Sequence, residues 1–131
     1  MQLLIHIEAN NLSQPHGHNS VIEWTRKTHP TITTFDFNTL SQSSVTGYAM
    51  DLIKQADQIL MIVEIKIEKN LQLIKEFIET TMGLEGKSVQ LVVNGIHAKK
   101  MADHVQVDHR LNNVPAQGQK KLIGEFFSKG A

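Results

Sequence analysis

Residues 13–20, SQPHGHNS, bring together several side chains that could bind a ligand. His16 and His18 are separated by one residue, a spacing at which two imidazoles can share a metal ion. Asn19 and Ser20 can donate hydrogen bonds to an anion, and they precede an amphipathic segment whose N-terminal amides would do the same. The segment therefore admits three interpretations: a metal site, a phosphate site, or a loop that ends in a helix cap.

The metal interpretation is the weakest of the three. Two histidines need at least a third ligand, and the sequence gives no reason to place His97, His104 or His109 beside them, so we expect no metal. Ser20 and Glu23 have the three-residue spacing of a capping box. A cap on the helix that follows is therefore enough to explain why Ser20 stands at the end of residues 13–20. A capped helix can also bind phosphate, so the phosphate site and the simple cap both stay open.

The other polar residues near predicted strands are interpreted as structural. His6 lies inside an apolar run, where we expect a hydrogen-bonded histidine of the core. Asp108 and His109 are adjacent in a predicted strand, so their side chains point to opposite faces and do not form a dyad. Glu64 and Lys66 share one face past a predicted strand, which we interpret as a solvated strand end, leaving contact with a ligand open. The sequence identifies no catalytic residue.

The composition narrows the class of protein. With 131 residues, the chain is expected to form a single domain, residues 1–131. A formal net charge of zero gives no reason to expect a nucleic-acid or membrane partner. The absence of cysteine excludes disulfides, thiolate nucleophiles and cysteine-bound metals. No apolar stretch approaches the ~20 residues of a membrane span, and the first apolar run is too short for a signal peptide. We therefore expect a soluble, cytoplasmic protein.

Apolar runs alternate with amphipathic segments along the chain. The runs predict strands, and the segments with apolar residues three and four apart predict helices. Trp24 is expected to pack from its helix and Tyr48 to lie on a buried stripe, and residues 64–67 are expected to be a frayed or exposed extension of a strand. The predicted strands cover residues 3–7, 31–37, 59–63, 88–95 and 104–111, and the predicted helices cover residues 20–29, 45–56 and 68–82 and a segment after Pro115.

This order predicts an α/β fold, a three-layer α/β/α sandwich around a five-stranded, mostly parallel sheet. The alternating, threonine-rich run at residues 31–37 predicts an edge strand. Residues 95–103 are short for a parallel crossover, so the direction of the last strand stays open.

Three short motifs resemble the flavodoxin-like fold, and within it the branch of the NAD(P)H quinone reductases. One is the polar loop at residues 13–20, and the others are Gln55-Ala56-Asp57-Gln58-Ile59 before the third strand and Leu84-Glu85-Gly86-Lys87-Ser88 before the fourth. The likeness covers the layout of residues 1–95. It implies the strand order 2-1-3-4-5 and a flavin mononucleotide (FMN) whose phosphate binds at Ser13, His18, Asn19 and Ser20.

The resemblance implies a flavin-dependent oxidoreductase, if the protein is an enzyme. Residues 64–70, EIKIEKN, depart from the family because they hold no proline, glycine or aromatic residue to pack on the flavin ring, and residues 95–100, GIHAKK, offer no such platform either. Two alternatives follow. One is a non-catalytic binding or assembly module that has lost the cofactor site and could form a homodimer. The other binds a different phosphate-bearing small molecule, such as a nucleotide.

Overall fold

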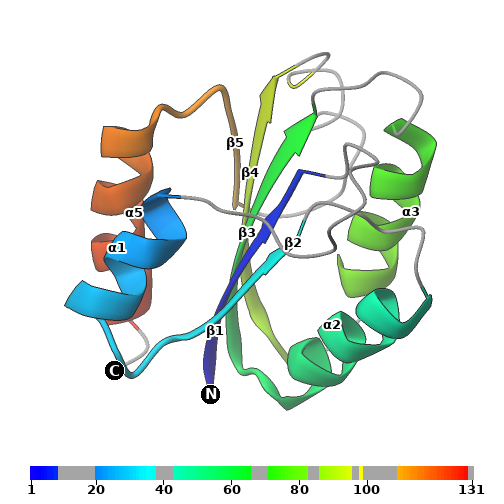
Figure 1. Cartoon of the computed structure of the whole chain (residues 1–131), viewed down its shortest axis with the longest axis horizontal. Helices are drawn as coiled ribbons and strands as arrows, with labels where there is room; N and C mark the ends of the chain where they lie inside the picture. Colours follow the sequence, from blue (N-terminus) through cyan, green and yellow to red (C-terminus); the bar gives the residue numbers. More distant parts are fainter. Residues whose placement is uncertain are drawn as a thin grey trace.

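A computed structural model shows one twisted sheet with helices on both of its faces (Figure 1). It describes residues 1–8, 20–37, 43–65, 71–82, 86–95, 98 and 109–129. The strands are β1 Gln2–Ile7, β2 Thr33–Phe37, β3 Gln58–Ile65, β4 Ser88–Gly95 and β5 His109–Asn112. The helices with assigned bounds are α1 Ser20–Thr28, α2 Ser43–Gln55, α3 Leu71–Met82 and α5 Ala116–Ser128.

The five strands are all parallel and lie in the order β2-β1-β3-β4-β5. This confirms the predicted α/β fold and its flavodoxin-like strand order, and it settles the direction of the last strand. The predicted edge strand, β2, is at one edge of the sheet. The register places His6 opposite Asp36 of β2 and opposite Ile62 of β3, while Glu64 is opposite Asn94 of β4.

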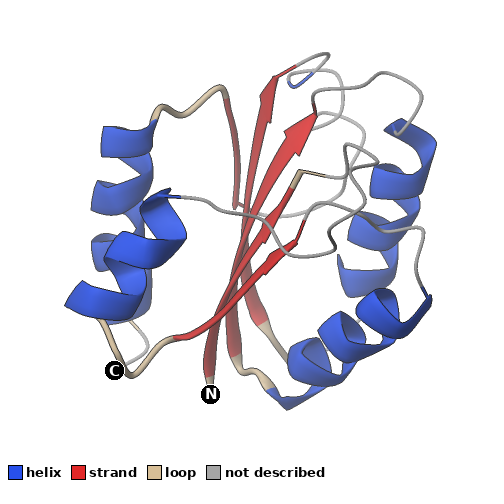
Figure 2. Ribbon diagram, viewed as in Figure 1, coloured by secondary structure: helices blue, strands red, loops and turns tan. Residues whose placement is uncertain are grey.

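The two faces of the sheet carry separate apolar cores. Helices α1 and α5 cover one face, and α2 and α3 cover the other (Figure 2). Alternate residues of each strand enter one core or the other: in β3, Leu60 and Ile62 face α1 and α5, whereas Met61 and Val63 face α2 and α3. Strands buried on both faces explain the continuous apolar runs in the sequence.

Two details of the sequence prediction are wrong. Tyr48 is 56% exposed although it falls on the apolar stripe of α2. Its ring rests on Phe35, with centroids 5.2 Å apart, at the border of the stripe, where the phenol hydroxyl can stay in water. Glu64 and Ile65, predicted to lie in a frayed or exposed extension, instead continue the β3–β4 ladder, and Ile65 is fully buried, while residues 66 and 67 lie outside the described residues.

The link between β4 and β5 is described only at Ala98, which is helical and buried in the core under α2 and α3. Residues 104–108, predicted as the first part of the last strand, lie outside the described residues. None of the helices in the described part of the chain is long and apolar enough to cross a bilayer.

Candidate functional site

Four polar side chains line up on one face of the sheet where its strands end. They come from neighbouring strands, and each is two or four residues beyond an apolar residue of the core under α1 and α5, so all face that side. We call them the polar row; its members, in order across the sheet, are Asp36, His6, Glu64 and Asn94.

His6 is the most buried member of the polar row, with 1% of its surface exposed. Its Nδ1 lies 2.7 Å from Oδ1 of Asp36, a carboxylate that is itself buried. Its Nε2 lies 3.6 Å from Oε1 of Glu64, whose side chain is 18% exposed. The imidazole therefore stands between two carboxyl groups, one enclosed and one that reaches solvent.

This environment favours the charged form of the imidazole. Burial lowers the pKa of His6, but the hydrogen bond to Asp36 and the negative charges of Asp36 and Glu64 outweigh burial and raise the pKa from 6.5 to about 9. The ring is therefore an imidazolium at neutral pH, with Nδ1–H donating to Asp36. The expectation of a hydrogen-bonded core histidine is confirmed.

Asn94 connects the polar row to the start of α5. Its Nδ2 donates to the carbonyl oxygen of Val114 at 3.0 Å, and its Oδ1 accepts from the Val114 amide at 2.7 Å. The next residue, Gly95, has a φ of 98°, and a Cβ there would overlap the carbonyl oxygen of Ile65. Only glycine fits this close approach, which lets β4 run as far as Gly95 beside Ile65.

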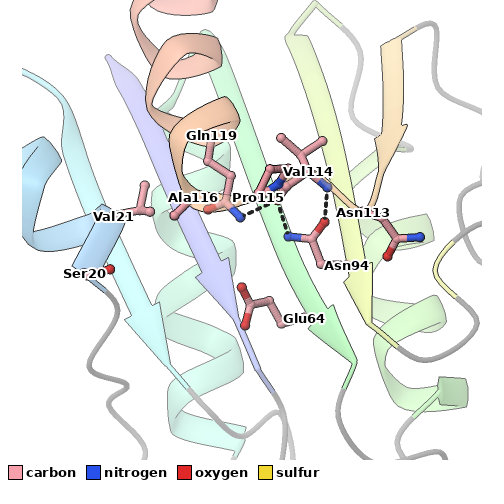
Figure 3. Close-up of a pocket in the computed structure, with 9 residues that line it drawn as sticks. All are labelled: Ser20, Val21, Glu64, Asn94, Asn113, Val114, Pro115, Ala116 and Gln119. Carbon is pink, nitrogen blue, oxygen red and sulfur yellow. Dashed lines mark hydrogen bonds between the residues drawn. The ribbon is translucent and has the colours of Figure 1, made fainter.

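A pocket of about 480 Å³ opens beside the polar row (Figure 3). It lies between the first residues of α1 and α5 and the ends of β3 and β4. In open parallel sheets, ligands bind beyond the carboxyl ends of the strands, beside the point where strand order reverses, which here is the boundary of β1 and β3. We call this pocket the edge pocket. The residues that line it are Ser20, Val21, Glu64, Asn94, Asn113, Val114, Pro115, Ala116 and Gln119.

The edge pocket contains a buried acceptor without a hydrogen-bond partner among the described residues. Gln119 is 3% exposed, and its Nε2 donates to the carbonyl oxygen of Val114 at 2.8 Å. Its Oε1 is buried and accepts no hydrogen bond from the part of the chain that the structure describes. Leaving such an acceptor unpaired costs about 1–3 kcal/mol. A ligand or water with a suitably placed N–H or O–H would remove that cost.

Helix α5 also reaches the edge pocket with its N-terminal end uncapped by a side chain. The residue before it, Pro115, is extended and makes no side-chain cap bond. The first amides of a helix have no partners within the helix, and they carry the positive end of its dipole. The pocket therefore combines acceptors, Glu64 and Gln119, with the amides at the start of α5.

One of the four sequence-predicted binding residues can be placed. Ser20 is the first residue of α1, is exposed, and lines the edge pocket. Ser13, His18 and Asn19 lie outside the described residues, as do His16, His97, His104 and Lys66. The prediction of a solvated strand end at Glu64 is wrong, because Glu64 contacts His6 and lines the pocket.

Sequence reasoning missed the polar row and Gln119. A signal for the row is present in the sequence, because each of four apolar runs carries one polar residue near its end. Comparisons of the chain with protein-family models, with curated proteins and with solved structures found no match.

Proposed function

We propose that the protein binds a small phosphate-bearing molecule in the edge pocket, with FMN as the first candidate. The observation that carries the proposal is the position of the pocket, beside the reversal of strand order and between the starts of α1 and α5. Ser20, the described member of the predicted phosphate loop, lines it.

The described residues fit one end of FMN better than the other. Ser20 and the start of α1 would hold the phosphate, and Gln119 and Glu64 would accept hydrogen bonds from hydroxyl or N–H groups of the flavin. The negative charge of Glu64 opposes a phosphate, but the imidazolium of His6 beside it reduces that repulsion. None of the nine described lining residues is aromatic, so they offer no surface on which the flavin ring would stack.

If FMN binds, the protein belongs functionally with the flavin-dependent oxidoreductases that its sequence resembles. The flavin would then supply hydride and electron transfer, and the chain would bind and orient it. The alternative is a non-catalytic module that binds a ligand or assembles with a partner, such as a second copy of the chain. The lack of an aromatic residue among the described lining favours this alternative.

Titration with FMN, followed by flavin fluorescence and melting temperature, tests the proposal. We expect saturable binding of one FMN per chain, and a stabilisation of about 2.7 kcal/mol when free FMN is 100 times Kd. Riboflavin, which lacks the phosphate, should bind more weakly. Ser20→Ala should weaken FMN binding, whereas Ser88→Ala, an exposed serine at the opposite end of the sheet, should not.

The outcomes separate the candidate functions. Equal binding of FMN and riboflavin would refute a phosphate site at the start of α1. No binding of FMN at millimolar concentration would refute the flavoprotein proposal. A nucleotide that raises the melting temperature when FMN does not would identify a different phosphate-bearing ligand.

A further inference from the structure

We propose that His6, Glu8 and Glu64 form a binding site for a divalent transition-metal ion at the rim of the edge pocket. One ligand atom from each residue lies within 4.8 Å of the other two. The site draws Glu64 from β3, His6 from β1, and Glu8 from the residue directly after β1. Its three ligands are all among the residues that the structure describes.

The spacing of the ligand atoms suits a zinc-sized ion. Zinc binds imidazole nitrogen and carboxylate oxygen at about 2.0–2.2 Å, so two ligands of one tetrahedral ion lie roughly 3.4 Å apart. His6 Nε2 and Glu64 Oε1 are 3.6 Å apart. Side-chain rotation of Glu8, which lies past the end of the strand and is half-buried, would bring its carboxylate to the same ion.

Asp36 supplies the feature that distinguishes this cluster from an ordinary group of acidic residues. Its carboxylate accepts a hydrogen bond from Nδ1 of His6 at 2.7 Å, which fixes the ring and leaves Nε2 directed at Glu64. A histidine that binds a metal through one ring nitrogen almost always donates a hydrogen bond from its other ring N–H to a carboxylate or carbonyl in this way. Because His6 and Asp36 are both buried, this arrangement exists before any ion arrives.

The charges and the access also suit a divalent ion. Two glutamates neutralise a charge of +2, and the ion would replace the proton on Nε2 as the positive charge between them. Three protein ligands leave a fourth position for water or for an atom of a ligand. Glu64 lines the edge pocket, so an ion bound to its carboxylate would be at the rim of that pocket.

Zinc titration of the full chain, after dialysis against a chelator and then against chelator-free buffer, tests the site without FMN. The titration is run at pH 8, because protons compete with zinc for Nε2. We expect one Zn²⁺ per chain by calorimetry, with Kd at or below the micromolar range, and a higher melting temperature. In a histidine-detected ¹⁵N spectrum, Nε2 of His6 should shift on zinc binding while Nδ1 stays protonated.

Variants separate this site from the other six histidines of the chain. Glu8→Gln keeps the shape of the side chain and should weaken zinc binding at least tenfold. Glu125→Gln, on the exposed face of α5, is the matched control and should leave Kd unchanged. The double variant Glu8→Gln and Glu64→Gln should lose zinc binding at His6, while circular dichroism checks that it folds.

Three results would overturn the proposal. They are no saturable zinc uptake by the wild-type chain, a Glu8→Gln variant that binds zinc as tightly as the wild type, and a zinc-induced shift confined to histidines other than His6. Zinc and FMN are titrated separately, so failure of either proposal leaves the other to be judged by its own result.

Discussion

The pKa of His6 predicts how the stability of the metal-free protein depends on pH. The pKa of this imidazole is raised from 6.5 to about 9 in the folded chain, so between these values the folded state holds a proton that the unfolded state has lost. The stabilisation is complete below pH 6.5 and is lost as pH rises through about 9. The difference between the two pKa values corresponds to about 3 kcal/mol of folding free energy, and the steepest slope is about 1.2 kcal/mol per pH unit.

Urea unfolding at pH 6, 7.5, 9 and 10, with a chelator present, measures this dependence. Trp24, the one tryptophan of the chain, is half-buried in the core under α1 and α5 and reports unfolding by fluorescence. We expect the free energy of unfolding to fall by about 3 kcal/mol from pH 6 to pH 10. The urea dependence of that free energy should stay constant, so that the change reflects stability and not a different unfolded state.

Substitution of Asp36 isolates the contribution of His6 from that of other groups that titrate in the same range. Asp36→Asn removes the charge and keeps the shape, so the pKa of His6 should fall and the pH profile should become flatter. Asp51→Asn, on the exposed side of α2, should keep the wild-type profile. A wild-type free energy of unfolding that is flat between pH 6.5 and 9 would refute the reasoning, because His6 would then be neutral in the folded protein.

Three further substitutions test the packing around the site, each by urea unfolding. Gly95→Ala should destabilise the fold by more than about 2 kcal/mol, because Gly95 has a positive φ and a Cβ there would overlap Ile65. Gly124→Ala, in α5 with open space around it, should stabilise the fold by about 1 kcal/mol. Equal effects of the two substitutions would contradict this reasoning. Asn94→Ala should cost about 1–3 kcal/mol, since it leaves two backbone groups of Val114 without these bonds, and no loss would mean that water replaces them. Ile62→Ala should cost about 2–5 kcal/mol through the cavity it leaves, and a cost below 1 kcal/mol would show that the core collapses around the site.

The sheet could be predicted from sequence because its strands are buried on both faces. The apolar run at residues 59–63 has no polar face, which is typical of an interior parallel strand, and β3 is the central strand of the five. The alternating run at residues 31–37 likewise indicated the edge position that β2 occupies. These inferences need only local periodicity, which one sequence contains.

The candidate site could not be predicted because it depends on register between distant strands. Asp36 is 30 residues from His6, and no local pattern says which residues of two parallel strands will be opposite each other. The contact of Glu64 with His6 cannot be inferred from local sequence for the same reason, since it follows from the pairing of β1 with β3. Gln119 is polar within a helix and buried, and only the position of α5 over the sheet explains that burial.

The pair of His6 and Asp36 also limits which alternative folds the chain can adopt. Parallel strands of Leu, Ile and Val can slide past each other by two residues and still present apolar side chains to the same core. In β1 and β2 such a slip would separate the imidazolium from its carboxylate and leave Asp36 opposite Leu4 or beyond the end of β1. An uncompensated buried charge is strongly unfavourable. This one polar contact therefore favours the native register of β1 and β2 over the shifted registers that apolar packing alone would tolerate.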